Sequence, residues 1–148
     1  MILRRGEVGA RDPGGSAPRL EAALGDAGGL GQFGVNLVTL APGQHSSDRH
    51  WHETEEEFLY MLDGRLVVVE DTGETEIGPG DACVWPAGVA NAHHVRNRSA
   101  RPATYLMVGT RPERDVVHYP DSGRTLRSGP ECWRITDSQG RILDEGRD

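Results

Sequence analysis

The chain has 148 residues, of which 36% are hydrophobic and 26% charged, and its formal net charge is −7. This length fits one domain with a single core and excludes two independent catalytic domains. The acidic balance argues against nucleic-acid and anionic-membrane partners, and no apolar run approaches the ~20 residues of a membrane-spanning helix. The first residues contain no apolar signal core, and two cysteines are too few for a disulfide framework, so we expect a cytoplasmic protein.

Residues 1–32 differ from the rest because two turn-forming, glycine-rich stretches, RDPGGSAP and GDAGGLGQ, flank the short segment LEAAL. LEAAL, residues 20–24, predicts one or two helical turns, which are marginal in water unless they dock onto another element. We therefore expect residues 1–32 to form an N-terminal arm.

In residues 33–110, short apolar runs typical of strands alternate with turn signals. The expected strands include QFGVNLVTL, EFLYML, RLVVVE, ACVW and ATYLMV. Asp63 and Gly64 separate EFLYML from RLVVVE and predict a type I′ hairpin turn, which needs positive φ at both central positions. About eight strands without a long helix predict an all-β fold, an antiparallel sandwich or barrel.

Residues 111–148 turn polar, through RPERDVVHYPDSGRTLRSGP, and lack a clear apolar alternation. WRI and RIL are weak candidates for terminal strands. We expect this segment to be a largely irregular C-terminal extension that packs on the barrel.

Four of the six histidines fall into two groups, His50 with His52 and the adjacent pair His93 and His94. Because side chains alternate along a strand, His50 and His52 point to the same side. Glu57 opens the next apolar strand and can project from it to the same point. Two imidazoles and a carboxylate from paired strands form a ligand set for a divalent metal, and an imidazole from the second group would complete it.

Two segments resemble the sequence motifs of the cupin superfamily. Residues 43–64, GQHSSDRHWHETEEEFLYMLDG, resemble the first motif: a glycine, H-x-H, three or four residues, a glutamate, six residues and a glycine. Residues 80–97, GDACVWPAGVANAHHVRN, resemble the second motif. The matching positions are Gly43, His50, His52, Glu57, Gly64, Gly80, Pro86, Gly88, His93 and Asn97. The resemblance implies a double-stranded β-helix, or jelly-roll barrel, over residues 33–110, with the metal ligands His50, His52, Glu57 and His93.

Two spacings depart from the cupin motifs. Six residues instead of five separate Gly43 from His50, and four instead of two separate Gly88 from His93. Both are insertions in turns, so they alter loops and leave the strand-borne ligands in place. His93 and His94 stay open as alternatives because adjacent strand residues face opposite sides. We favour His93, which keeps the three-residue gap before the asparagine of the motif.

The remaining chemically notable side chains have simpler expected roles. His45 is expected at the surface, His118 outside the site, and the glutamates that precede Glu57 in a solvated turn. The residues expected to pack in the barrel or at an interface are Cys83, Phe58, Tyr60 and Trp85. The arginines considered for a phosphate at the barrel mouth are Arg49, Arg65 and Arg96.

The expected ligand set bears on the metal and on the reaction. Three imidazoles and a carboxylate already fill the shell of a tetrahedral zinc, so catalysis suits a metal with five or six ligands. We favour iron, manganese or nickel, with zinc as an alternative. Glu57, the anionic ligand, is the residue to which we assign a catalytic role.

Cupins similar to this chain include dioxygenases, decarboxylases, lyases, isomerases, epimerases and sensory domains, and a fold alone does not select a reaction. Our first hypothesis is a mononuclear metal enzyme of dioxygenase or lyase type that binds a small carboxylate, enol or carbonyl compound. The second is a non-catalytic ligand-binding or regulatory cupin, and the third is a sugar-phosphate isomerase or epimerase. Apolar residues at outward strand positions favour a homodimer.

Overall fold

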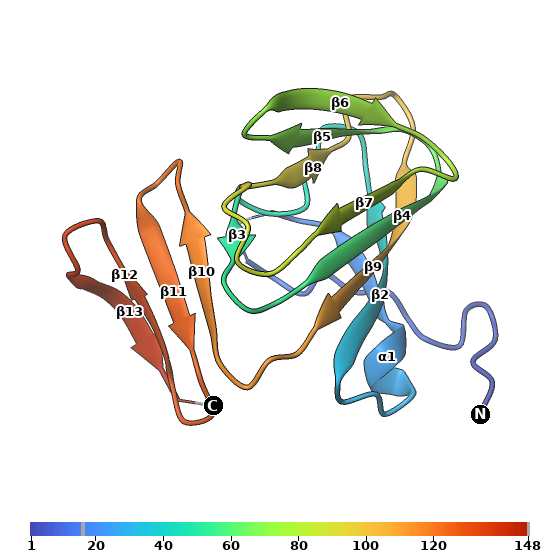
Figure 1. Cartoon of the computed structure of the whole chain (residues 1–148). Coiled ribbons are helices and arrows are strands. Elements are labelled where there is room, and N and C mark those ends of the chain that lie inside the picture. The colour runs from blue at the N-terminus through green and yellow to red at the C-terminus, as the bar shows by residue number, and fades with distance from the viewer. Residues whose placement is uncertain (16, 148) are drawn as a thin grey trace.

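The computed structural model describes residues 1–15 and 17–147, which form mostly β-strands (Figure 1). A four-residue helix, α1, spans Leu24–Ala27. The strands are β1 Leu20–Ala23, β2 Phe33–Leu40, β3 Trp51–His52, β4 Glu57–Asp63, β5 Leu66–Glu70, β6 Gly73–Ile77, β7 Ala82–Trp85, β8 His94–Arg96, β9 Ala103–Thr110, β10 Asp115–Tyr119, β11 Arg124–Ser128, β12 Trp133–Thr136 and β13 Ile142–Gly146. The predicted all-β, antiparallel architecture is confirmed.

The strands form three antiparallel sheets, with the orders β1-β2-β9-β4-β7, β6-β5-β8 and β13-β12-β11-β10-β3. The first two sheets enclose the apolar core, because each contributes its inward side chains to one cluster. The core residues are Val38, Leu40, Leu59, Met61, Leu66, Val68, Ile77, Trp85, Val95, Ala103 and Tyr105. In Figure 1, strands β10 to β13 lie together beside the strands that hold this core.

Alternation along β4 shows how the sequence specifies the two faces of the first sheet. Leu59 and Met61 are buried, whereas Phe58 and Tyr60 are exposed on the opposite face. Glu57 continues the inward series. A carboxylate is thereby directed into the interior at the end of the strand, beyond the apolar core.

The predicted hairpin at Asp63 and Gly64 is wrong. β4 pairs with β7 and β9, whereas β5 pairs with β6 and β8, so the two strands lie in different sheets. Gly64 has a φ of 79°, but Asp63 does not have positive φ, as a type I′ turn requires. A Cβ at Gly64 would lie 2.7 Å from Ala103 Cα. This glycine therefore lets the chain cross between sheets against the start of β9.

Both terminal segments contain more regular structure than the sequence predicts. The first four residues of LEAAL form β1, which pairs with β2 instead of coiling into a helix. The segment expected to be irregular contains β10 to β13, and β10 pairs with β3. Within residues 1–15 and 17–147, no helix is long and apolar enough to cross a membrane.

Candidate metal centre

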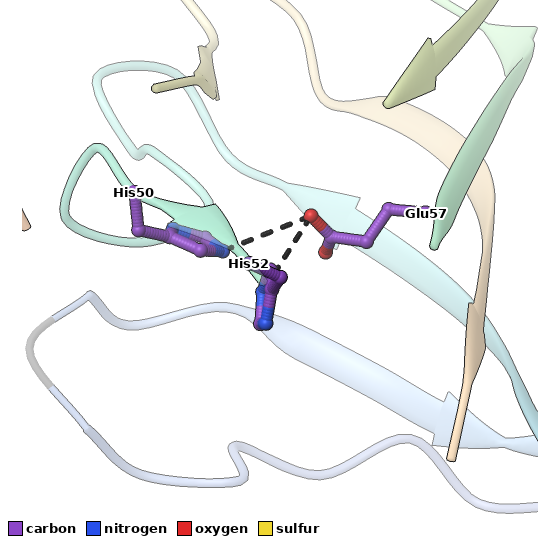
Figure 2. A group of neighbouring side chains, drawn as sticks. All are labelled: His50, His52 and Glu57. Carbon is purple, nitrogen blue, oxygen red and sulfur yellow. Dashed lines mark ion pairs between the residues drawn. The ribbon is translucent and has the colours of Figure 1, made fainter. Parts of the chain in front are cut away.

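Three separate segments bring the predicted ligands together. His52 lies on β3 and Glu57 at the start of β4, and the side chains of His50, His52 and Glu57 point toward one another (Figure 2). His93 joins them because its backbone pairs with that of His50: each N–H donates to the other residue's carbonyl, at 2.8 and 3.2 Å. The structure thus gathers all four residues that the sequence analysis selected.

One oxygen of Glu57 is the meeting point of the cluster. Its Oε2 atom lies 3.9 Å from His50 Nε2, 3.7 Å from His52 Nε2 and 2.7 Å from His93 Nε2. The indole of Trp85 stacks on the face of the His93 ring, with ring centroids 3.9 Å apart and planes 4° from parallel. The donor atoms therefore come from side chains with restricted positions.

The second nitrogen of each imidazole donates a hydrogen bond away from Glu57. His50 and His93 donate from Nδ1 to the backbone carbonyl two residues earlier, at 2.8 and 3.0 Å. His52 donates from Nδ1 to Asp115 Oδ2, at 2.5 Å. Carbonyl and carboxylate oxygens only accept, so each Nδ1 carries a hydrogen. His50 and His52 can then present a lone pair at Nε2, whereas at His93 a metal ion would have to replace the hydrogen that Nε2 shares with Glu57.

Three of these donors have a spacing that could hold a divalent metal ion: the ligand atoms of His50, His52 and Glu57 all lie within 4.8 Å of one another. His93 lies outside this group and contacts it through its hydrogen bond with Glu57. The Nε2 lone pairs of His50 and His52 face the Glu57 carboxylate, which repels them, and a cation between these groups would reverse the interaction. With bonds of about 2.1 Å, the ligand atoms of an octahedral ion lie about 3.0 Å apart in adjacent positions and about 4.2 Å apart in opposite ones. The separations of 3.7 and 3.9 Å fall within this range. For His93 to become a fourth ligand, its ring would have to move, because it lies outside the group of donors within 4.8 Å of one another and its 2.7 Å hydrogen bond with Glu57 would have to open.

His94 faces away from the cluster, as alternation along the chain requires. Its Nδ1 atom donates to the Ser47 carbonyl at 2.9 Å, and its ring lies 5.7 Å from the ring of His45. His93, by contrast, is only 3% exposed and bonds to Glu57. The geometry therefore favours His93 over His94, and its role as a ligand stays a prediction.

Burial and charge set the protonation of the cluster. Burial lowers the pKa of His50, although Glu57 opposes this shift. For Glu57, burial favours the neutral acid, but the hydrogen bond with His93 and the neighbouring imidazoles outweigh it and lower the pKa. Burial raises the pKa of Glu55 to about 7. A neutral imidazole beside an ionised carboxylate is the state that binds a metal.

A cavity of about 600 Å³ opens beside the cluster. Its wall includes Glu55, Arg19 from the N-terminal segment, Arg111 after β9, and Tyr119 and Leu126 from β10 and β11. Glu55 lies against Gly109, where a Cβ would come within 2.3 Å of Glu55 Oε1. The cavity thus combines the candidate metal donors with a further carboxyl group and two guanidinium groups.

The other predicted residues lie outside the cluster. His118 stacks on Trp51 and bonds to Glu53, and His45 is half-buried beside His94. Cys83 is a free thiol packed against the core, where burial raises its pKa to about 11. The arginines considered for a phosphate are placed elsewhere: Arg49 binds Asp71 and Asp121, Arg65 pairs with Glu76, and Arg96 is exposed.

Four site residues were not predicted from the sequence. Glu55 was expected in a solvated turn, but the structure places it half-buried in the cavity wall. Asp115 is 63 positions from the histidine it contacts and lies in the segment expected to be irregular. Arg19 and Arg111 reach the cavity wall from segments without a recognised motif. Nothing in local patterning identifies these residues, because strand pairing across the whole chain brings them to the cavity.

Comparisons with known proteins agree with the geometry. A family model described as "Cupin domain" matches residues 36–109. A crystal structure of a sugar phosphate isomerase of the cupin superfamily from Silicibacter pomeroyi is 44% identical, with 85% of this chain and 80% of that chain covered and a TM-score of 0.82. A proposed sugar phosphate isomerase from Acidithiobacillus ferrooxidans is 30% identical, with 97% and 96% covered and a TM-score of 0.89.

A more distant structure, a predicted oxalate decarboxylase from Thermotoga maritima, is 25% identical, with 74% of this chain and 98% of that chain covered and a TM-score of 0.63. None of the curated proteins searched matches the sequence. The structural relatives therefore share the fold and carry names from more than one class of reaction.

Proposed function

The chain belongs to the cupin family, and on that premise we propose that it is a mononuclear metal-dependent enzyme that isomerises a small phosphorylated sugar. The proposed metal donors are Glu57 and the Nε2 atoms of His50, His52 and His93. One observation carries the proposal: three Nε2 atoms converge on one carboxylate oxygen, while each Nδ1 donates its hydrogen away from it.

Two features favour a sugar phosphate as the substrate class. The relatives from Silicibacter pomeroyi and Acidithiobacillus ferrooxidans, at 44% and 30% identity, are named for this activity. The cavity wall also contains Arg19 and Arg111, which pair with Glu21 and Asp26. Guanidinium groups can bind phosphate oxygens in pairs, and a phosphate here would share these arginines with the two carboxylates or replace them. Its volume of about 600 Å³ lies in the range of small-molecule sites.

Different groups in the cavity would supply the two parts of the reaction, polarisation of the substrate oxygens and proton transfer. A bound divalent metal would polarise the carbonyl and hydroxyl oxygens of the sugar. Isomerisation moves the hydroxyl proton to the former carbonyl oxygen, and it also moves a proton from the carbon that bears the hydroxyl group to the neighbouring carbonyl carbon. Glu55 lines the cavity outside the proposed ligand set, so we assign it this proton transfer. Gly109 leaves the space in which its carboxyl group lies.

A second candidate is a lyase or dioxygenase that acts on a small carboxylate. The relative from Thermotoga maritima, a predicted oxalate decarboxylase, favours this alternative. The same four donors would hold the metal, and the two arginines would bind a carboxylate instead of a phosphate. The reactions differ in their products, since decarboxylation releases carbon dioxide and a dioxygenase consumes oxygen.

The test is a turnover assay with protein loaded with manganese, iron or nickel. We expect aldose and ketose phosphates to interconvert in NMR spectra, and we expect chelation or His50→Ala to abolish the reaction. Glu55→Gln should lower kcat by about 10²- to 10⁴-fold, whereas Glu56→Gln, the exposed neighbour, should not. Oxygen uptake or carbon dioxide release from small carboxylates without sugar isomerisation would favour the second candidate. If no metal form turned over sugar phosphates or small carboxylates, the result would contradict the proposal that the protein is an enzyme.

We further propose that the protein is a homodimer formed through the outer face of the first sheet. This face carries exposed apolar side chains from β4 and β7: Phe58, Tyr60, Leu62 and Val84. Their neighbours across the sheet, Leu106 and Val108 on β9, are also apolar. Light scattering should give twice the chain mass, and Tyr60→Lys should shift the protein to a monomer. A wild-type monomer at tens of micromolar would contradict the dimer.

A further inference from the structure

Asp115 lies at the start of β10, outside the segment matched by the family model, yet it contacts His52, one of the proposed metal ligands. It is 8% exposed, and its Oδ2 atom lies 2.5 Å from His52 Nδ1. We propose that Asp115 is a positioning residue, which fixes the ring and the tautomer of His52 so that its Nε2 lone pair faces the metal. This inference rests on the metal centre proposed above.

The second carboxylate oxygen of Asp115 also accepts hydrogen bonds. Oδ1 accepts from the backbone N–H of Thr54 at 2.9 Å and from its hydroxyl group at 2.7 Å. The backbone around this contact is fixed by the pairing of β10 with β3, in which Val117 lies opposite His52. Both ends of the His52–Asp115 hydrogen bond are therefore held by neighbouring structure, which limits rotation of the imidazole.

His52 differs from the other two imidazoles in the group that orients it. His50 and His93 donate to backbone carbonyls of their own segments, at 2.8 and 3.0 Å. His52 alone among the three donates to a side-chain carboxylate, which comes from a distant strand. A carboxylate acceptor also strengthens an imidazole as a metal ligand.

The same atoms form a second group of metal-ligating type, because Glu55 Oε2 lies 3.6 Å from His52 Nδ1. A second ion between His52 and Asp115 would require these atoms to be about 3 Å apart or more, given bonds of about 2.1 Å. Their separation of 2.5 Å is instead that of a short charge-assisted hydrogen bond. The geometry points to orientation of a ligand and not to a second metal site.

Asp115→Asn tests this role because an amide has a single accepting oxygen, whereas the carboxylate accepts from Thr54 at Oδ1 and from His52 at Oδ2. The backbone N–H of Thr54 cannot change, whereas His52 can move its proton from Nδ1 to Nε2 and accept from the amide NH₂. We expect long-range ¹H–¹⁵N spectra of metal-free protein to show His52 protonated at Nδ1 in the wild type and at Nε2 in the variant. His50 and His93 should stay protonated at Nδ1 and serve as internal controls.

Metal titration then tests the role of Asp115 separately from the existence of the metal centre. Asp115→Asn should weaken manganese or nickel binding by about 10- to 100-fold, whereas Thr54→Val, which removes a hydroxyl contact to the same carboxylate, should change it little. Circular dichroism of each variant checks the fold, and Asp115→Ala provides a second variant without the competing amide. An unchanged His52 tautomer, or unchanged affinity in both Asp115 variants, would overturn the role of Asp115. Failure of the wild type to bind either metal would overturn the proposed metal centre instead.

Discussion

The barrel and the C-terminal sheet are held in place by different forces. Every residue of the apolar core cluster lies between Val38 and Tyr105. Among the described residues, β10 to β13 add Val117 to the buried hydrophobic side chains, and β13 is largely exposed. Burial of apolar surface therefore stabilises the barrel, and it contributes little to the outer strands of the C-terminal sheet.

The contacts that attach the C-terminal sheet gather around β3. His52 bonds to Asp115, and His118 stacks on Trp51 with ring centroids 4.2 Å apart. Ion pairs add to these contacts, joining Arg124 to Asp48 and Arg49 to Asp121. The strand that carries a proposed metal ligand is thus also the attachment point of the sheet. The barrel therefore provides most of the stability, and the C-terminal sheet completes the site.

The largest effect should come from the barrel core. Leu59→Ala removes a side chain that is 1% exposed and should lower the free energy of unfolding by about 2–5 kcal/mol. Leu143→Ala, at a position in β13 that is 55% exposed, should change it by less than about 0.5 kcal/mol. Urea denaturation of both variants measures the difference. Equal losses would contradict the contrast between the two regions.

A second effect concerns the cavity between the two regions and depends on pH. Burial raises the pKa of Glu55 from 4.5 to about 7, so between these pH values the folded protein keeps a proton that the unfolded chain releases. The free energy of unfolding should therefore fall as pH rises through this window, by about 3 kcal/mol at most. In metal-free protein, Glu55→Gln should exceed the wild type in stability at pH 8 and match it at pH 4.

Urea denaturation at both pH values checks this prediction, with Glu56→Gln as the matched control because that side chain is exposed. The control should follow the wild type at both pH values. If Glu55→Gln gave no gain at pH 8, the carboxyl group of Glu55 would not be destabilised by burial in the cavity.

The smallest expected effect is a difference in reactivity between the two thiols, one in each region. Cys83 packs against the barrel core, where burial raises its pKa to about 11, whereas Cys132, next to β12, is exposed. Because the thiolate is the reactive form, iodoacetamide at pH 8 should modify Cys132 in native protein and reach Cys83 only after denaturation. Mass spectrometry of the labelled peptides measures the order. Rapid native labelling of Cys83 would contradict its burial.

The sequence predicts best where local periodicity matches tertiary packing. Alternation along β4 predicts both its buried residues and the inward direction of Glu57, and the two histidine groups mark the cluster. The hairpin at Asp63 failed because a turn signal does not reveal which strands pair. The role of Asp115 could not be read from the sequence, since its contact with His52 depends on pairing between β3 and β10.

The most direct test of the account is the metal content of the purified protein. Wild-type protein and His94→Ala, dialysed against manganese, iron or nickel and analysed by elemental mass spectrometry, should each retain about one ion per chain. The double variant His50→Ala, His52→Ala should retain almost none, because it lacks two of the donors that face Glu57. Full metal content in the double variant would contradict the proposed centre.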